Sequence, residues 1–519
     1  MAEHFGSSES KSSGANHFAE REGRGSTGHP SSVWLMVFVT VVMAALLVPF
    51  VGLAVRPTTT SAEKRELATW PSLTTEGGAP NAAFLSEAGE WFSDHYAFRN
   101  ELVDANAHLR SDLLGTSSAT NVIVGTDGWL YYRGSVMDYQ RTSRMSDRAV
   151  SNAAHNLALM SEYATSRGGR LVVAVAPDKT TLYPEHLPYY IQAGSGPSNL
   201  ERLQDLLDGE GVAYVDLADE LGAYGGTLYR VQDTHWTPEG AAVAADAILD
   251  ALGHAHEDYA SSPTTTLRSV GDLAQMLWPQ SAGLEEVSRY TDAWQFAYAN
   301  DASSPEDTTV QTVSTASDAA GSLLMFRDSF GNALVPFMAS SYQDADFSRL
   351  IPYNLGGMAD GQDVVVLRAE RHVASFATRP AYIPAPERDA SVVAGSTGLT
   401  TQTTLTAQYN GPYLEVKGSV DPRYLPADGV VYVTVEAAGT GRTYECYSVS
   451  SSEGQVADAE GAGDSDPAFQ GDTGYLAYLL TDQYPQNAGS VTVHVLVRGS
   501  AGVSEVLSQE VDLADVPSK

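Results

Sequence analysis

Two short segments of the chain carry residue types that could perform acyl transfer. Asp233 and His235 lie two positions apart, and Ser329 follows Arg327-Asp328 much later in the chain. A serine hydroxyl becomes a nucleophile when a histidine removes its proton, and a carboxylate fixes the tautomer of that histidine and stabilises its cation. These residue types are compatible with a Ser329–His235–Asp233 triad, with the backbone N–H of Ser329 available to an oxyanion.

The same residues also have ordinary structural explanations. Asp233 could cap the coming turn, His235 could pack with Trp236, and Ser329 could cap the next helix. Asp233 and His235 could also supply two metal ligands, but the sequence places no third. A second histidine- and acid-rich cluster at 254–258 trails a predicted helix and is typical of a solvated surface, so we predict no bound metal.

An alternating pattern of helices and strands surrounds these segments. Residues 171–176 form a continuous apolar run, which is typical of a strand buried on both faces of a parallel sheet. In such sheets the working residues gather at the carboxyl ends of the strands, so we expect Asp178-Lys179, the Asp233 segment and Ser329 at one edge. Further strands are predicted at 212–217, 323–326 and 364–367, helices at 151–167, 199–207, 238–252 and 333–340, and an irregular insertion at 259–320.

The pattern changes after residue 376. Residues 377–398 are rich in proline and are predicted to be a linker. Beyond them, apolar residues alternate with a period of two and no helical pattern interrupts them, which predicts a C-terminal β-sandwich over 399–519 with an acidic loop at 453–466. Five tyrosines could form a sugar-stacking face on it or pack in its core; they are Tyr413, Tyr432, Tyr444, Tyr447 and Tyr475.

The N-terminal segments have a different character. Residues 1–32 are polar and are predicted to be disordered. Residues 33–55 are uncharged and long enough to cross a hydrocarbon core of about 30 Å, so we predict a single transmembrane anchor rather than a cleaved signal. Basic residues flank this segment equally on both sides, so charge alone does not set its orientation.

The composition excludes some classes of function. The chain has 519 residues, 43% of them apolar, and a net charge of -34. This acidic balance argues against nucleic-acid binding, which depends on Lys and Arg neutralising phosphates. The single cysteine, Cys446, excludes an intramolecular disulfide and a cysteine-rich metal site, and we predict that it is buried.

Taken together with further motifs, these residues resemble the AlgJ/AlgX-like family, also called DHHW-like proteins. Members of that family have SGNH-hydrolase-type domains that O-acetylate exported polysaccharides, and the resemblance covers residues 60–376. The motifs that carry it are Glu63 to Ala68 with Trp70-Pro71, Trp91 to Arg99, Gly125 to Tyr131, Ala176 to Lys179 with Tyr183 to Glu185, Asp233 to Pro238, Gly271 to Leu273 with Met276-Leu277, Arg327 to Asn332, and Glu370-Arg371.

The resemblance implies an SGNH-like α/β domain with a mostly parallel sheet. In it, Ser329 would be the nucleophile, His235 the base and Asp233 the acid that orients the base. One departure is Arg327, because the family usually has glycine there; Arg327 could point at the pocket or face solvent. Spacing leaves the oxyanion partners open, and the candidates are Arg327, Asn332, Arg349, Tyr353 and Asn354. Glu370-Arg371 could be an internal salt bridge or part of the site rim.

The resulting prediction is a membrane-anchored, extracytoplasmic O-acetyltransferase of a cell-surface or exported polysaccharide. Its N-terminus would be cytoplasmic, and residues 33–55 would lie in the bilayer. The resemblance implies no cofactor and an acetyl donor supplied by a multi-pass membrane O-acyltransferase. An esterase that uses the same triad, and a non-catalytic scaffold whose β-sandwich binds glycan, are the alternatives.

Overall fold

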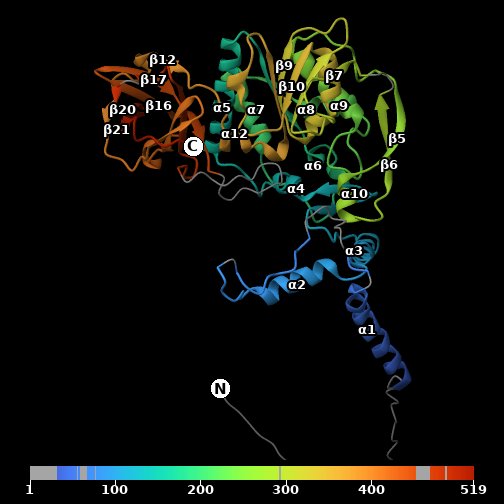
Figure 1. Cartoon of the computed structure of the whole chain (residues 1–519). Helices are drawn as coiled ribbons and strands as arrows, with labels where there is room; N and C mark the ends of the chain where they lie inside the picture. The colour runs from blue at the N-terminus through green and yellow to red at the C-terminus, as the bar shows by residue number, and fades with distance from the viewer. Residues whose placement is uncertain are drawn as a thin grey trace, which may run out of the picture. The chain divides into compact units, whose positions relative to one another are not determined.

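The computed structural model describes residues 32–54, 56–58, 67–75, 77–290, 294–451, 468–485 and 488–518 (Figure 1). The chain divides into two compact units, Met1–Asn100 and Glu101–Lys519. Residues 1–31 of the predicted tail, motif residues 63–66 and the predicted acidic loop 453–466 lie outside the described residues.

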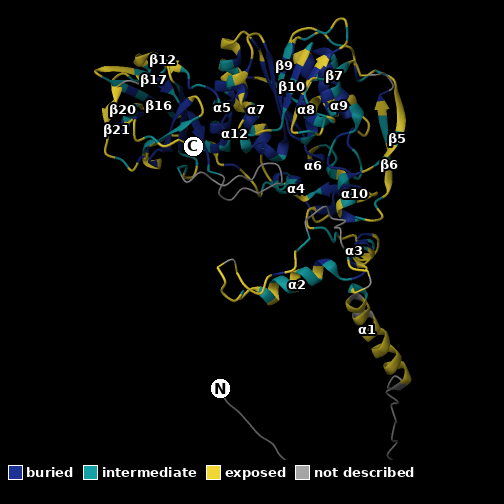
Figure 2. Cartoon of the chain, in the orientation of Figure 1, coloured by how far each residue is buried: buried dark blue, intermediate teal, exposed yellow. Residues whose placement is uncertain are grey.

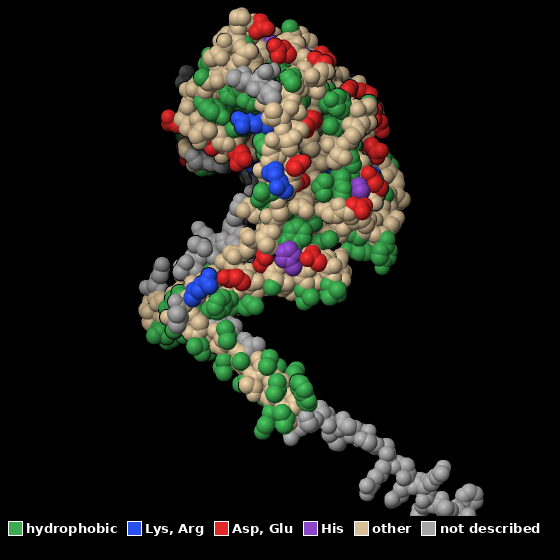
Figure 3. Space-filling view, turned by 90° about the vertical axis from the view of Figure 1, so that its right-hand side faces the viewer, with side chains coloured by type: hydrophobic (Ala, Val, Ile, Leu, Met, Phe, Trp, Pro, Cys, Tyr) green, Lys and Arg blue, Asp and Glu red, His purple; other side chains and the backbone are tan. Residues whose placement is uncertain are grey.

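The first unit contains helices α1 (Ser32–Leu53) and α2 (Phe84–His95). Large apolar side chains of α1, among them Trp34, Met36 and Phe38, are exposed (Figures 2 and 3). Among the helices that the structure describes, however, none is both long and apolar enough to cross a membrane. The predicted transmembrane anchor at 33–55 is therefore not confirmed.

The second unit is built on a seven-stranded sheet with the order β4-β3-β11-β9-β10-β8-β7. The first five strands in this order are parallel, β8 runs antiparallel to β10, and β7 runs antiparallel to β8. The strands are β3 (Leu171–Ala176), β4 (Ala213–Val215), β7 (Phe296–Tyr298), β8 (Thr309–Ser314), β9 (Ser322–Phe326), β10 (Asp344–Ser348) and β11 (Asp363–Ala369).

Helices cover both faces of this sheet. Alternate residues of β3 point to two different cores: Val172 and Ala174 pack in one, and Val173 and Val175 in the other. The first core is closed by α8 (Leu217–Tyr224), α9 (Pro238–Leu252) and α11 (Val335–Ser341), and the second by α5 (Asp147–Ser166), α7 (Asn199–Glu210) and α12 (Ser375–Thr378). The predicted α/β domain with a mostly parallel sheet is thus observed.

Several smaller elements lie outside this sheet. They are α3 (Arg99–His108), the π-helical turn η1 (Leu109–Leu113), the antiparallel pair β1 (Val122–Val124) and β2 (Leu130–Tyr132), α4 (Arg133–Tyr139), α6 (Lys179–Leu182) and the 3-10 turns η2 (Pro184–His186), η3 (Ser329–Ala333), η4 (Leu355–Gly357) and η5 (Glu370–His372).

The prediction that 259–320 is irregular was wrong. This segment holds an antiparallel pair, β5 (Thr264–Val270) and β6 (Leu284–Tyr290), around helix α10 (Asp272–Leu277), and it also supplies β7 and β8 to the main sheet. The inward positions of β8 include the polar residues Thr312 and Ser314. Because these residues replace apolar ones, the hydrophobic alternation that marks a strand was missing from the sequence.

The C-terminal region is a β-sandwich. A six-stranded sheet of order β12-β17-β16-β20-β21-β13 packs against a four-stranded sheet of order β14-β15-β19-β18 across one apolar core. The strands are β12 (Glu387–Arg388), β13 (Thr397–Gly398), β14 (Thr406–Asn410), β15 (Tyr413–Ser419), β16 (Val430–Ala437), β17 (Thr440–Glu445), β18 (Tyr447–Val449), β19 (Gly474–Leu480), β20 (Ser490–Gly499) and β21 (Gly502–Asp512), with 3-10 turns η6 (Ala390–Val393) and η7 (Pro422–Tyr424).

Three predictions about this region can be compared with the structure. The segment predicted as a linker, 377–398, supplies the edge strands β12 and β13. Cys446 is buried, as predicted. The five tyrosines proposed for a sugar-stacking face are also buried, with at most 6% of each exposed, so they form core rather than a platform.

The sandwich is joined to the α/β domain through α5, which packs against β18. The buried amide of Asn156 donates hydrogen bonds to the carbonyls of Phe376, at 2.8 Å, and Ser448, at 2.9 Å. Arg388 of the sandwich forms a two-pronged ion pair with Glu162 of α5. A polar and apolar interface therefore fixes the two parts against one another within the second unit.

Candidate active site

Ser329 lies at the carboxyl end of β9, on the first residue of the 3-10 turn η3. The carboxylate of Asp328 shapes this turn, because one oxygen accepts from the N–H of Phe330 at 3.0 Å and the other from the N–H of Ala369, at the end of β11, at 2.6 Å. Ser329 itself is half-buried, so its hydroxyl is presented at the sheet edge.

The Asp233–His235 segment is a loop between α8 and α9 rather than the end of a strand. A single antiparallel bridge joins Tyr229 and Trp236, and the N–H of Arg230 donates to the carbonyl of His235 at 3.1 Å. Thr237 then caps α9 through Gly240, with Pro238 at the first helical position, and the helix spans the predicted residues 238–252. The loop reaches the carboxyl edge of the sheet without entering it.

These two segments bring the three predicted side chains together. The Nδ1 atom of His235 is 2.8 Å from Oδ1 of Asp233, and its Nε2 atom is 2.9 Å from Oγ of Ser329. Because a carboxylate only accepts, Nδ1–H donates to Asp233, and Nε2 is left to accept the hydroxyl proton of Ser329. In this arrangement His235 can accept the hydroxyl proton of Ser329 while Asp233 holds its ring in place.

The surroundings of Asp233 keep it ionised. Its second oxygen accepts from Nη1 of Arg230 at 2.7 Å and from the N–H of Asp272 at 3.1 Å. Burial would raise the pKa of Asp233, but the hydrogen bonds from His235 and the charge of Arg230 outweigh it and hold that pKa below its usual value. The pKa of His235 is depressed by burial and raised more strongly by Asp233, so on balance it lies above 6.5.

Asp233, His235 and Asp272 are also the group that could hold a metal ion, with ligand atoms within 4.8 Å of one another. Their lone pairs, however, are already engaged. Oδ1 of Asp272 accepts from the N–H groups of Thr234 and Leu273, and the guanidinium of Arg230 lies on Asp233. A cation next to that guanidinium would be repelled, so the donor set fits a hydrogen-bonded triad better than a metal centre.

Arg327 occupies neither of the places predicted for it. Its side chain is 0% exposed, and Nη2 donates to the carbonyls of Pro305 and Asp307, each at 2.8 Å. Its Nη1 donates to Oδ1 of Asn332 in the turn that carries Ser329. Arg327 is therefore buried away from solvent, and it ties the loop at 305–307 to the turn that carries Ser329.

The other oxyanion candidates have ordinary structural placements. Arg349 donates to the carbonyl of Glu306 at 3.3 Å, Tyr353 is buried with its ring centre 4.9 Å from that of Phe326, and Asn354 is exposed before η4. These contacts explain the side chains without an oxyanion, so their role in the site stays a prediction.

Lys179 is a site residue that the sequence suggested but did not explain. Its Nζ atom donates to the carbonyls of Leu130, at 2.8 Å, and Val231, at 3.2 Å, and so connects β2 to the loop that carries the histidine. Its side chain is almost fully buried, and burial lowers its pKa to about 7 against the opposing attraction of Asp233 and Asp272. Lys179 thus fixes the position of the loop.

Glu370 and Arg371 both belong to an internal network around Asp178. Nη1 of Arg371 binds Asp178 at 2.7 Å, while Glu370 accepts from the N–H of Asp178 at 2.9 Å and from the hydroxyl of Thr181 at 2.6 Å. The guanidinium of Arg371 also lies 5.5 Å from the ring centre of Phe330, next to Ser329. Arg371 is therefore a salt-bridge residue and also a neighbour of the nucleophile.

Asp328 and His372 form a second buried pair behind the nucleophile. Nδ1 of His372 lies 3.2 Å from Oδ2 of Asp328, and both side chains are buried. Burial opposes ionisation of Asp328, but His372 and nearby arginines outweigh it and hold the pKa of Asp328 below its usual range. In the sequence, the histidine just after the end of β11 is the feature that could have indicated this pair.

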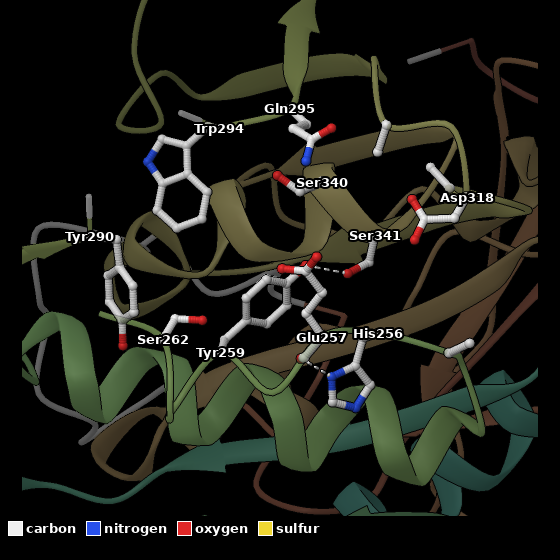
Figure 4. Close-up of a pocket in the computed structure, with 13 residues that line it drawn as sticks. His256, Glu257, Tyr259, Ser262, Tyr290, Trp294, Gln295, Asp318, Ser340 and Ser341 are labelled. Carbon is white, nitrogen blue, oxygen red and sulfur yellow. Dashed lines mark hydrogen bonds between the residues drawn. The ribbon is translucent and has the colours of Figure 1, made fainter. Parts of the chain in front are cut away.

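A hollow of about 650 Å³ lies away from these residues, beside the ends of α9 and α11 (Figure 4). Tyr259 and Trp294 form part of its wall. Its serines Ser340 and Ser341 donate to the carbonyls of Pro336 and Phe337, at 2.8 and 3.2 Å, so neither is arranged as a nucleophile. The metal-like cluster at 254–258 borders this hollow: His254 lies 3.1 Å from the carbonyl of Ser341, and His256 lies 3.3 Å from each of Asp246 and Asp250.

Comparison with known families finds a match within the α/β domain. The family model described as "SGNH hydrolase-like domain, acetyltransferase AlgX" matches residues 122–323, which include Asp233 and His235 and end before Ser329. A protein of Pseudomonas syringae pv. tomato named "Probable alginate O-acetylase AlgJ" is 30% identical over 170 residues, covering 30% of this chain and 41% of the relative. The protein of the same name from Pseudomonas aeruginosa is 30% identical over 142 residues, covering 26% of this chain and 34% of the relative. The chain thus spans less than half the length of these relatives.

Solved structures with low similarity include the O-acetyltransferase domain of Pseudomonas putida AlgJ, at 19% identity and a TM-score of 0.32 over 49% of this chain and 92% of that one. A DHHW family protein from Eubacterium siraeum is 16% identical, with a TM-score of 0.35 over 43% of this chain and 88% of that one. The motifs in the sequence and the family model agree: residues 122–323 match the model of an SGNH hydrolase-like domain described for the acetyltransferase AlgX.

Proposed function

We propose that the chain is an O-acyltransferase that moves an acetyl group onto a hydroxyl of a cell-surface or exported polysaccharide. The observation that carries this proposal is the 2.9 Å contact between Nε2 of His235 and Oγ of Ser329, with Asp233 behind the imidazole. The AlgX-type domain and the relatives named as O-acetylases support acetyl as the group that is transferred.

In the first step, Oγ of Ser329 attacks the carbonyl carbon of the acetyl donor. The hydroxyl proton passes to Nε2 of His235, and the leaving group departs with that proton as the acyl-enzyme forms. Asp233 keeps the proton on Nδ1 and stabilises the imidazolium that appears in between. The N–H of Ser329 is a donor for the negative oxygen of the tetrahedral intermediate.

In the second step, a sugar hydroxyl attacks the acetyl carbon of the acyl-enzyme. Nε2 of His235 takes the proton of that hydroxyl and returns it to Oγ of Ser329 as the ester bond to the enzyme breaks. The acetylated sugar leaves, and the serine is restored. The same two residues therefore serve in both half-reactions, with the donor and acceptor bound in turn.

Hydrolysis is a second candidate because the site is open to water. The side chain of His235 is 29% exposed, so water could replace the sugar as the acceptor. The two reactions share the acyl-enzyme and differ in how well the acceptor excludes water.

An assay with an activated acetyl ester, run with and without an oligosaccharide, distinguishes transfer from hydrolysis and from a non-catalytic scaffold. Transfer predicts acetylated oligosaccharide, hydrolysis predicts acetate alone, and a non-catalytic scaffold predicts neither product. Ser329→Ala should abolish both products. Ser340→Ala, which changes a serine at the hollow of Figure 4, is the matched control and should keep wild-type rates.

We further propose that a multi-pass membrane O-acyltransferase supplies the acetyl group and that no cofactor is needed. In this proposal residues 33–55 hold the chain in the bilayer, with the N-terminus cytoplasmic and the catalytic domain outside. The exposed apolar side chains of α1 support attachment to lipid. Membrane fractionation of the full chain, compared with a chain lacking 33–55, tests this: equal recovery in the soluble fraction would contradict it.

A further inference from the structure

A groove of about 1190 Å³ lies within the second unit, between the α/β domain and the β-sandwich. One wall comes from α4, the start of α5 and the segment 142–146 that joins them, and the other from Ser451, Gly471 and Asp472 of the sandwich. The hydroxyl of Ser146 donates to Asp472 at 2.6 Å and holds the walls together at one point.

The groove leads toward the nucleophile through Arg371. This residue lines the groove, and its guanidinium also lies 5.5 Å from the ring centre of Phe330, the residue after Ser329. Arg371 is held in place by Asp178 at 2.7 Å. Arg371 therefore connects the lining of the groove with the turn that carries Ser329.

The groove contains a buried acceptor that the protein does not satisfy. Asp138 of α4 is 5% exposed, and its Oδ1 accepts from the amide of Asn199 at 2.8 Å. Within the described part of the chain, nothing donates a hydrogen bond to its Oδ2 atom. An unpaired buried acceptor is costly, so a ligand that brings a donor to this atom gains free energy that a ligand without donors does not.

The charges around the groove disfavour an anionic ligand. Its lining holds two acidic residues that are ionised at neutral pH, Asp138 and Asp472, and two basic ones, Arg144 and Arg371. Glu370 also lines the groove, but its raised pKa of about 8 keeps it mostly protonated at neutral pH. Arg371 already forms an ion pair with Asp178, and Nη1 of Arg144 donates to the carbonyl of Pro197 at 3.1 Å. A polyuronate would bring further carboxylates, which cannot donate hydrogen bonds and would be repelled, whereas a neutral sugar brings only hydroxyls.

We propose that this groove binds the acceptor glycan, and that the acceptor is an uncharged, hydroxyl-rich polysaccharide rather than a polyuronate. This inference rests on the proposed transfer reaction, whose acceptor it describes. Asp138 is the residue that receives a sugar hydroxyl.

Titration calorimetry of the full chain tests this proposal, with Ser329→Ala used to prevent turnover. The probes are uncharged hexasaccharides of β-1,4-glucan, β-1,4-mannan and β-1,6-linked N-acetylglucosamine, compared with hexagalacturonate. At least one uncharged probe should bind at least about tenfold more tightly than hexagalacturonate. Asp138→Asn should weaken that binding by about tenfold or more, because it replaces a charged acceptor with a donor. Asp208→Asn changes an exposed acid on α7 outside the groove and should leave the affinity unchanged.

Two results would overturn the proposal: hexagalacturonate binding as tightly as every uncharged probe, or an affinity that Asp138→Asn does not change, which would mean that the atom binds only water. A thermal melt of each variant shows whether it is folded. Labelling of Ser329 with a serine-directed reagent is done in parallel on the wild type. It distinguishes a failure of the groove proposal from a failure of the proposed acyl-transfer chemistry. A labelled serine without selective glycan binding refutes the groove alone, and selective binding without labelling refutes the acyl-transfer chemistry alone.

Discussion

The substitution Asp233→Asn tests how the tautomer of His235 is fixed. Each carboxylate oxygen of Asp233 accepts two donors: Oδ1 from the N–H and Nδ1 of His235, and Oδ2 from Arg230 and the N–H of Asp272. An asparagine has only one oxygen, and the positive charge of Arg230 draws it to that side. The amide NH₂ then faces Nδ1, which must accept, so the ring proton moves to Nε2 and points at Ser329.

In that tautomer His235 can no longer take the serine proton. General-base catalysis typically contributes about 10²–10⁴-fold, so we expect kcat for hydrolysis of an activated acetyl ester to fall by at least about 100-fold. The protein should remain folded, because the change is nearly isosteric and removes a charge that burial disfavours. Stopped-flow release of the leaving group, combined with a thermal melt, measures both quantities.

Asp272→Asn is the matched control, since it removes a neighbouring carboxylate that does not hydrogen-bond the imidazole. Oδ2 of Asp272 lies 3.7 Å from Nδ1 of His235, beyond hydrogen-bond distance. We expect a loss of less than about tenfold. Activity should increase with pH as His235 loses its proton, with a midpoint above 6.5. Because Asp272 helps to raise the pKa of His235, Asp272→Asn should shift this midpoint to lower pH. If Asp233→Asn kept more than about a third of the wild-type rate, or if the two variants lost equal activity, the reasoning would be refuted.

Three further predictions concern the residues that support the site. Asp328→Ala should destabilise the protein by about 3–5 kcal/mol, because it breaks a buried pair with His372 and removes the cap of the nucleophile turn; a change below about 1 kcal/mol in urea denaturation would contradict this. Lys179→Met should cost about 1–3 kcal/mol for each carbonyl left unpaired, with a lower kcat than the wild type; unchanged urea midpoint and rate would show that the loop is held by other contacts. Burial raises the pKa of Glu370 from 4.5 to about 8, so its stabilising contribution is full below the unfolded-state value and is lost as the pH rises through about 8. Glu370→Gln should therefore melt higher than the wild type by a margin that widens between about pH 5 and pH 9, whereas parallel melting curves would argue against a buried carboxyl.

Much of the α/β architecture was predictable because its central strands are fully apolar. The run at 171–176 is buried along its whole length as β3, and α9 begins at Pro238 and ends at Leu252, as predicted from its cap and periodicity. The juxtaposition of Ser329, His235 and Asp233 was also predictable, since loops at one edge of a parallel sheet converge. These features depend on local patterns that a sequence shows directly.

The remainder depends on tertiary contacts that local patterns do not show. Strand β8 was missed because its inward positions include threonine and serine. We predicted that Arg327 faces either solvent or the pocket, but its Nη2 atom donates to the carbonyls of Pro305 and Asp307. The spacing of residues in the sequence does not show such a contact. The two acceptors of Lys179 come from separate parts of the chain for the same reason.

The central claim is that Ser329 carries the acyl group, and trapping the acyl-enzyme tests it most directly. The full chain would be mixed with an activated acetyl ester, quenched in acid within a turnover and digested for mass spectrometry. The account predicts one acetyl group on the peptide that contains Ser329, no such group in Ser329→Ala, and strongly reduced acetylation in His235→Ala. Acetylation at another residue that persists in Ser329→Ala, or no covalent intermediate while the ester is consumed, would contradict the account.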